Sequence, residues 1–394
     1  MNEPFDRVPD LEALRAAYSH FLAPSRILLT GHSHQAWPDV AREAMLQAFD
    51  DAARFVDDKW EQAVFPRIEA VGARVLARMG FDPRDPISFG KSTHELCYRL
   101  LSCLPLHERP RIVTTRSEFH SLHRQLSRLA EAGAQVAWID TEPREALADR
   151  LLEALTPGTA MLAVSAVLFE DAYVVPHLGE IIARAVEIGA IPLIDAYHAF
   201  NVVPLAWGPA AAQAFVTAGG YKYAGFGEGV CWLRSPRGST LRPVYTGWFA
   251  DFAALGGERS TAVSYGEGGA RFSGATFDPA SFYRADVTLT HWDRFALSPA
   301  RLRAVSLRQT QRILDRLDAA GRAGDVLTAR DPARRGGFVT VRSPRAGAVV
   351  ERLRARGVFI DARGDRLRLG PAPYLRDEEI DRGTDVLIEA LQEA

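Results

Sequence analysis

The sequence predicts an α/β fold with a mostly parallel sheet, followed by a smaller α+β part. Three observations support this prediction: short apolar runs alternate with helical patterns between residues 93 and 233, the pattern changes after about residue 280, and 394 residues can bury a full core. We expect a large domain over residues 26–280 and a small α+β domain formed by residues 1–25 and 281–394.

The elements follow from the spacing of apolar residues. Strands are expected at the β-rich runs 111–115, 135–139, 160–167, 191–195, 214–218 and 230–233. Helices are expected between them at 93–103, 122–132, 144–155 and 178–188. The later chain predicts helices at about 299–320, 346–356 and 377 to the end, with short strands near 338–341 and 367–369. Such sheets bind ligands beyond the carboxyl ends of their strands.

Composition excludes several classes of protein. The apolar content of 47% and the charged content of 24% are ordinary for a globular protein. A net charge of -2 gives no electrostatic reason to expect a nucleic-acid or acidic-membrane partner. The acidic N-terminus does not resemble a signal peptide, and no apolar run approaches a membrane span. With only three isolated cysteines, we expect a cytoplasmic protein.

Lys222 stands out because the chain has only three lysines, against 44 arginines. It lies in the Gly- and Tyr-rich segment 219–229. A lysine amine can lose its proton when desolvated and form a Schiff base with an aldehyde, which an arginine cannot do. The alternative is an exposed lysine in a turn.

Asp195 closes a predicted strand 27 residues before Lys222 and is followed by His198. A carboxylate there, with a lysine on a later loop, suits pyridoxal 5'-phosphate (PLP): the acid would pair with the pyridine nitrogen and the lysine would bind the aldehyde carbon. His198 could reach the phenolic oxygen or the ring edge. The alternatives are a helix N-cap for Asp195 and a structural role for His198.

Two further segments fit the same cofactor. Ser92 and Thr93 open a predicted helix after a strand and a glycine, where backbone N–H groups and the helix dipole bind phosphate. The alternative, which is compatible, is a capping box of Ser92 and Glu95. Phe119 follows the strand 111–115 and could stack on the pyridine ring or belong to the core. We expect no metal site, because the histidine pairs at 32/34 and 120/123 lack a cysteine cluster or an H-E-x-x-H motif.

Taken in order, these residues resemble the fold-type-I PLP enzymes of the class V aminotransferase group, and most of all kynureninase. The resemblance rests on the phosphate loop, Phe119, the Asp-x-x-His motif, Tyr-Lys-Tyr at 221–223 and Gly-Trp-Phe at 247–249. It spans roughly residues 27–375. It implies an aspartate-aminotransferase-like large domain and a homodimer with shared active sites.

The resemblance also implies roles for individual residues. Tyr221 would contact the phosphate and relay protons, Trp248 would reach the phosphate of the partner subunit, and Thr276 would take the place of a cofactor- or substrate-binding asparagine. Arg368 would clamp the substrate carboxylate with its bidentate fork. His32 and Ser33 stand where kynureninases carry Gly-Asn-Ser-Leu-Gly, a segment that helps frame the substrate.

The expected activity is hydrolysis of the Cβ–Cγ bond of kynurenine or a related γ-keto amino acid, giving alanine and an acid. Lys222, Tyr221 and Asp195 would be the catalytic residues. Two alternatives stay open. One is another class V PLP enzyme, a β-lyase or an aminotransferase, acting on a different amino acid. The other is a non-catalytic binding protein with the same fold. A desulfurase is disfavoured because no cysteine follows Cys231.

Overall fold

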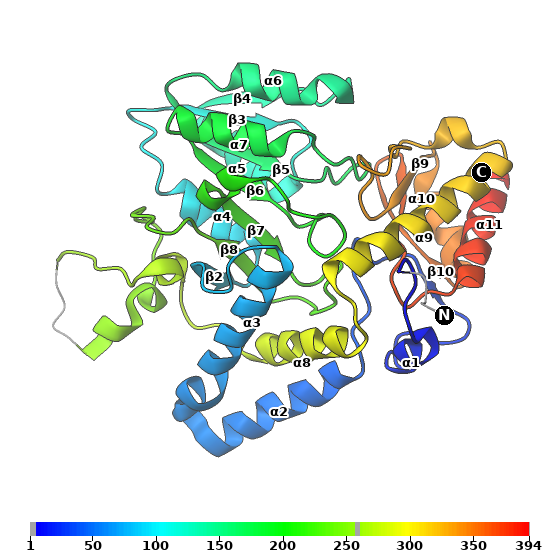
Figure 1. Cartoon of the computed structure of the whole chain (residues 1–394), viewed down its shortest axis with the longest axis horizontal. Coiled ribbons are helices and arrows are strands. Elements are labelled where there is room, and N and C mark those ends of the chain that lie inside the picture. Colours follow the sequence, from blue (N-terminus) through cyan, green and yellow to red (C-terminus); the bar gives the residue numbers. More distant parts are fainter. Residues whose placement is uncertain (1–4, 257–260, 394) are drawn as a thin grey trace.

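The computed structural model describes residues 5–256 and 261–393, so residues 1–4 and 394 of the predicted small domain lie outside it. Its centre is a seven-stranded sheet in the order β2-β8-β7-β6-β5-β3-β4 (Figure 1). The strands are β2 (Ile87–Gly90), β3 (Arg111–Thr115), β4 (Gln135–Ile139), β5 (Thr159–Ser165), β6 (Ile191–Asp195), β7 (Phe215–Gly219) and β8 (Cys231–Arg234). Strands β3 to β7 pair in parallel, and only β8 runs against its neighbours β2 and β7.

Helices cover both faces of this sheet. Successive side chains of its strands point to opposite faces, and on each face they are buried in a separate core. Val113 and Val164 face a core shared with α3 (Phe65–Arg78), α6 (Leu147–Ala154), α7 (Leu178–Glu187) and α8 (Ala280–Arg294). Ile112 and Ala163, one residue earlier in each strand, face a core shared with α4 (Thr93–Leu101) and α5 (His120–Glu131). Both faces of the sheet are therefore apolar, as expected for parallel strands.

A separate core holds the two ends of the described chain together (Figure 1). Leu14 of α1 (Leu11–Ala16) packs there with α9 (Pro299–Ala319), α10 (Ala346–Ala355) and α11 (Asp377–Glu393). The strands of this part are β1 (Ile27–Leu28) paired with β10 (Val358–Phe359), and the sheet of β9 (Val339–Arg342), β11 (Asp361–Arg363) and β12 (Arg366–Leu369). The predicted domain boundary after residue 280 stays a prediction, and α8 contributes Phe282 and Leu289 to a core of the large sheet.

The large-domain fold class is confirmed by this parallel sheet. Four α-helices were not predicted from the sequence: α1, α2 (Val40–Phe55), α3 and α8. Helices α2 and α3 both pack against α8 beside the sheet (Figure 1). Across the described residues, no helix has both the length and the apolar character that a membrane crossing requires.

Candidate active site

A cavity of about 260 Å³ opens at the carboxyl ends of the parallel strands. Five strands deliver a side chain from their last residue or from the loop that follows. The residues so placed are Ser92 and Thr93 after β2, Phe119 after β3, Ser165 of β5, Asp195 of β6, and Tyr221 and Lys222 after β7. The sheet therefore gathers residues that lie up to 130 positions apart, as the rule for parallel sheets predicts.

Lys222 is buried at the bottom of this cavity and is not the exposed turn lysine of the alternative interpretation. Its Nζ lies 2.9 Å from Nε2 of His198 and 4.2 Å from the centroid of the Tyr197 ring. Burial lowers the pKa of Lys222 to about 7, although the nearby Asp195 carboxylate opposes the shift. A large fraction of this amine is therefore unprotonated, and nucleophilic, near neutral pH.

The low pKa of Lys222 is directly measurable because the chain has only three lysines. In protein labelled with ¹³C-lysine and free of added cofactor, we expect one signal to titrate near pH 7, charged below that pH and neutral above it. The same signal should be missing from Lys222→Ala. If no lysine signal titrates below the ordinary value of about 10.4, the buried amine is not perturbed in this way.

Asp195 ends β6 and lines the cavity from the strand side. Its Oδ1 accepts the backbone N–H of Tyr197 at 2.8 Å. No helix begins there, since the next helical turn is η4 (Pro209–Gln213), so Asp195 is not a helix N-cap. Burial raises the pKa of Asp195, and the backbone hydrogen bond and Lys222 counteract the shift. A cationic ring nitrogen beside this carboxylate would stabilise its charged form.

His198 is buried beside Lys222, and burial lowers the pKa of its imidazole well below its usual range. The ring is therefore neutral, and Nε2 can accept a hydrogen bond from Lys222. Nδ1 is buried and has no hydrogen-bond partner within the described chain. An unpaired polar atom in a cavity wall is typical of a site that a ligand completes.

The first turn of α4 also lines the cavity. Ser92 is the N-cap, and its Oγ accepts the N–H of Glu95 at 3.3 Å. Glu95 in turn accepts the N–H of Lys91 at 3.1 Å. The capping interpretation therefore holds. Ser92 takes the N–H of Glu95, and an α-helix cannot satisfy the N–H groups of its first turn internally, so those of Thr93 and His94 are the ones that can face an anion.

Aromatic rings line the rest of the cavity. Phe119 lies immediately before α5, and the centroid of its ring is 5.2 Å from Nζ of Lys222. Tyr221 is partly buried, and burial raises the pKa of its hydroxyl to about 12. Its ring stacks on that of the exposed His34, with the ring centroids 5.0 Å apart. Tyr221 therefore keeps its proton at neutral pH.

The predicted substrate residues lie outside this cavity. Arg368 is buried on β12, where Asp361 of β11 pairs with its guanidinium. Its Nη1 donates at 2.7 Å to the carbonyl oxygen of Phe169, which does line the cavity. His32 is fully buried, with Nε2 at 2.9 Å from Asp361. Ser33 donates to the carbonyl oxygen of Thr30. Arg368 is thus one residue away from the cavity, and His32 lies behind it.

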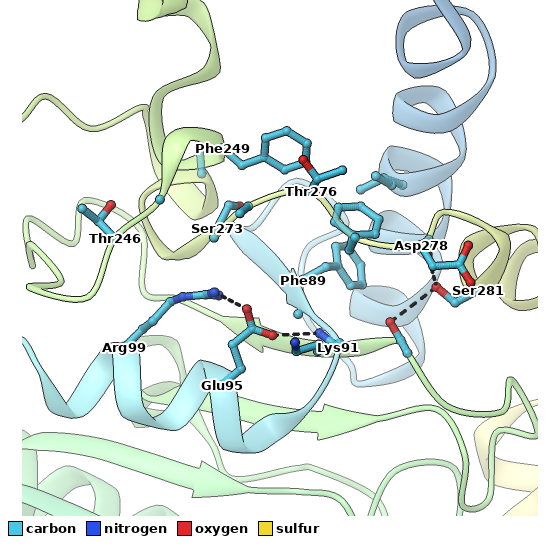
Figure 2. Close-up of a pocket in the computed structure, with 18 of the residues that line it drawn as sticks. Phe89, Lys91, Glu95, Arg99, Thr246, Phe249, Ser273, Thr276, Asp278 and Ser281 are labelled. Atoms are coloured by element: carbon cyan, nitrogen blue, oxygen red, sulfur yellow. Dashed lines mark hydrogen bonds and ion pairs between the residues drawn. The ribbon is translucent and has the colours of Figure 1, made fainter. Parts of the chain in front are cut away.

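Thr276 and Trp248 also lie away from Lys222 within the chain. Thr276 lines a second cavity of about 1150 Å³, which shares Lys91, Glu228 and Gly229 with the first. Figure 2 shows Thr276 and Phe249 on the opposite side of this cavity from Glu95 and Arg99. Trp248 is 43% exposed and packs on Phe252.

Three residues near the cavity were not predicted. Glu118 is buried beneath it and accepts from Ser165 and Thr115, and burial raises its pKa to about 7. Tyr197 lies between the two members of the Asp-x-x-His motif, so its place beside Lys222 could have been predicted. Asp361 could not, because its partner His32 is 329 residues away.

Comparison with known proteins identifies the fold that positions these residues. The model of the kynureninase C-terminal domain family matches residues 302–387. No curated protein matches the sequence. Among solved structures, a cysteine desulfurase from Thermococcus onnurineus NA1 matches at a TM-score of 0.82 and 19% identity, covering 98% of this chain and 99% of the other. The chain has the fold of this cysteine desulfurase over nearly its whole length.

Two other solved structures agree with this architecture. The cysteine desulfurase CsdA of Escherichia coli matches at a TM-score of 0.80 and 16% identity, over 98% of this chain and 99% of that one. The cystine C–S lyase C-DES, solved with its product cysteine persulfide, matches at 0.77 and 20% identity, over 94% and 99%. At these identities the likeness establishes the fold.

Proposed function

We propose that the chain is a PLP-dependent enzyme that binds its cofactor at Lys222. The observation that carries the proposal is a buried amine with a pKa of about 7 in a cavity that also contains an acid, an unpaired imidazole nitrogen and a helix N-terminus. These groups fit PLP: Lys222 for the aldehyde carbon, Asp195 for the pyridine nitrogen, and Ser92 and Thr93 for the phosphate. Phe119 would cover one ring face and His198 would contact the ring edge or its phenolic oxygen.

Bound PLP supplies an electron sink for bonds that break at the Cα of an amino acid. Lys222 would be the base that takes the Cα proton, since its lowered pKa suits proton transfer near neutral pH. Tyr221 donates protons as a phenol, because its pKa lies near 12. Asp195 would pair with a cationic ring nitrogen, which would counteract the rise that burial causes in its pKa.

The finer proposal is hydrolysis of the Cβ–Cγ bond of kynurenine or a related γ-keto amino acid. Water adds its oxygen to the γ-carbonyl carbon, the Cβ–Cγ bond breaks, and Cβ takes up a proton. The products are alanine and a carboxylic acid. The match of residues 302–387 to the kynureninase C-terminal domain supports this choice, because that region carries Arg368, our candidate clamp for the substrate carboxylate.

A second candidate is a β-lyase or an aminotransferase. The similarity to a cystine C–S lyase over 94% of the chain favours the β-lyase. In both candidates Lys222, Asp195 and Tyr221 keep the same roles. A non-catalytic protein is the third and weakest candidate, since all three side chains are present around the cavity.

We also propose a cytoplasmic homodimer with shared active sites. Trp248 and Thr276 support this, because both lie outside the Lys222 cavity of their own chain and Trp248 is partly exposed. In the dimer, Trp248 would reach the phosphate at the partner's site. Light scattering should give twice the 43.3 kDa mass of the chain, and a monomeric mass would exclude sharing.

The choice between reactions is testable with PLP-loaded protein and two groups of substrates. We expect L-kynurenine or L-3-hydroxykynurenine to give equal amounts of alanine and the corresponding aminobenzoate, followed by its fluorescence. L-cystine and L-cysteine should give no pyruvate above the level of Lys222→Ala. Pyruvate and persulfide in place of alanine would select the β-lyase, and a bound cofactor with no product from any amino acid would select the binding protein.

A further inference from the structure

His32, Asp361 and Arg368 form one continuous hydrogen-bonded chain behind the Lys222 cavity. Asp361 and Arg368 are directly paired residues on the antiparallel strands β11 and β12. Nε of Arg368 donates to Oδ1 of Asp361 at 2.9 Å, and Nη2 donates to Oδ2. The same Oδ1 lies 2.9 Å from Nε2 of His32. A residue of the N-terminal loop thereby contacts the acid that holds the candidate carboxylate clamp.

The guanidinium of Arg368 is fixed on two sides and has donors left over. The Asp361 carboxylate accepts hydrogen bonds from Nε and Nη2, and the carbonyl oxygen of Phe169 accepts one from Nη1. A guanidinium carries five N–H donors, so one proton on each of Nη1 and Nη2 has no partner among these bonds. Phe169 lines the Lys222 cavity, so Nη1 of Arg368 is separated from that cavity by one residue. A planar fork held in this way can take a second carboxylate without reorienting.

His32 donates to Asp361 as a neutral ring. Burial lowers its pKa to about 4, more than the hydrogen bond to Asp361 raises it. A neutral imidazole beside a carboxylate carries its proton on the nitrogen that faces the oxygen, here Nε2. Burial alone would raise the pKa of Asp361, but the hydrogen bonds from His32 and Arg368 outweigh it and lower the pKa. His32 therefore helps to keep Asp361 charged and in place.

Gly370 makes room for this histidine. A Cβ at position 370 would overlap Nδ1 of His32 and crowd its backbone nitrogen. Gly370 does not adopt a positive φ, so the backbone conformation itself does not require a glycine. The loop and the strand end are also joined by two backbone hydrogen bonds of 2.8 Å, from Gly31 to Gly370 and from Gly370 to Leu29. The glycine thus allows the close approach of His32.

We propose that His32 and Asp361 are positioning residues that hold the guanidinium of Arg368 for a substrate carboxylate, and that Gly370 provides the space this requires. This proposal rests on the proposed function. It names the residues that would determine selectivity for amino acids with a free carboxylate. It also separates His32 from the substrate: the imidazole acts through Asp361 and Arg368.

The test uses PLP-loaded protein and two probes that differ only in the carboxylate, L-alanine and L-alaninamide. Dissociation constants are measured from the change in the visible absorbance of the bound cofactor. The ratio of the two constants measures recognition of the carboxylate. We expect Arg368→Gln to abolish the preference for L-alanine. We expect His32→Ala to weaken the binding of L-alanine about tenfold or more, as for a lost hydrogen bond to a charged group. The binding of L-alaninamide should change little.

Two further variants keep the test independent of folding. His32→Asn retains a side-chain N–H for Asp361 and should keep most of the preference. Gly370→Ala should displace His32 and reproduce the loss seen in His32→Ala. The double variant His32→Ala/Gly370→Ala should bind L-alanine no more weakly than either single variant, since both changes break the same contact.

The outcomes separate this inference from the function on which it rests. If the unchanged protein takes up no PLP, or does not respond to L-alanine, the proposed function fails and the inference with it. If the unchanged protein prefers L-alanine but His32→Ala and Gly370→Ala keep that preference, the inference alone is overturned. Equal weakening of both probes would also overturn it, because a merely structural role lowers both affinities.

Discussion

Lys222→Ala should lower turnover of any accepted amino acid about 10²- to 10⁴-fold, the usual loss when a positioned proton-transfer group is removed. The reason is that the described cavity offers one buried amine of lowered pKa, and the alanine variant has none. Turnover is measured under single-turnover and steady-state conditions, with PLP in excess.

The matched control is Lys59→Ala. Lys59 lies beside α2, donates to the carbonyl oxygen of Val56, and does not line either of the two cavities described above. It should leave turnover unchanged. Equal loss in both variants, or full activity in Lys222→Ala, would contradict the assignment of Lys222.

Asp195→Asn should leave the cofactor bound but lower turnover about 100- to 1,000-fold, the equivalent of losing one member of a buried ion pair. Asparagine keeps the oxygen that accepts from the Tyr197 backbone, so only the charge is removed. Because the Asp195 carboxylate raises the pKa of Lys222, its removal should also shift the ¹³C titration of Lys222 below pH 7.

The titration distinguishes an electrostatic effect from damage to the fold. A variant whose lysine signal keeps its pKa would show that the carboxylate does not act on Lys222. Asp195→Glu, which keeps the charge on a longer side chain, should retain the Lys222 titration. Normal turnover in Asp195→Asn would remove Asp195 from the proposed catalytic set.

The sequence predicts the sheet well because its strands are short, apolar and separated by clear helical patterns. Strands β3, β4 and β6 begin and end where the apolar runs do. Helix α2 was not predicted, and its composition explains this: Leu46 and Phe49 are exposed, 57% and 73%, so no clean apolar face marks the helix.

The cofactor half of the site could be predicted because each residue follows a predicted strand. Parallel strands bring those ends together whatever their separation in the chain, and so Phe119, Asp195 and Lys222 meet. The substrate half depends on contacts between loops. The contact of His32 with Asp361 and Gly370 leaves no periodic pattern in the sequence, and only the folded chain brings these residues together.

Whether PLP binds at Lys222 is tested most directly by reducing the PLP-loaded protein with borohydride and mapping the modified peptide by mass spectrometry. Reduction makes the bond between the cofactor and a lysine permanent. We predict a pyridoxyl-phosphate mass on the peptide that contains Lys222 and on neither of the peptides with Lys59 and Lys91. Modification of either of those lysines, or of none, would contradict it.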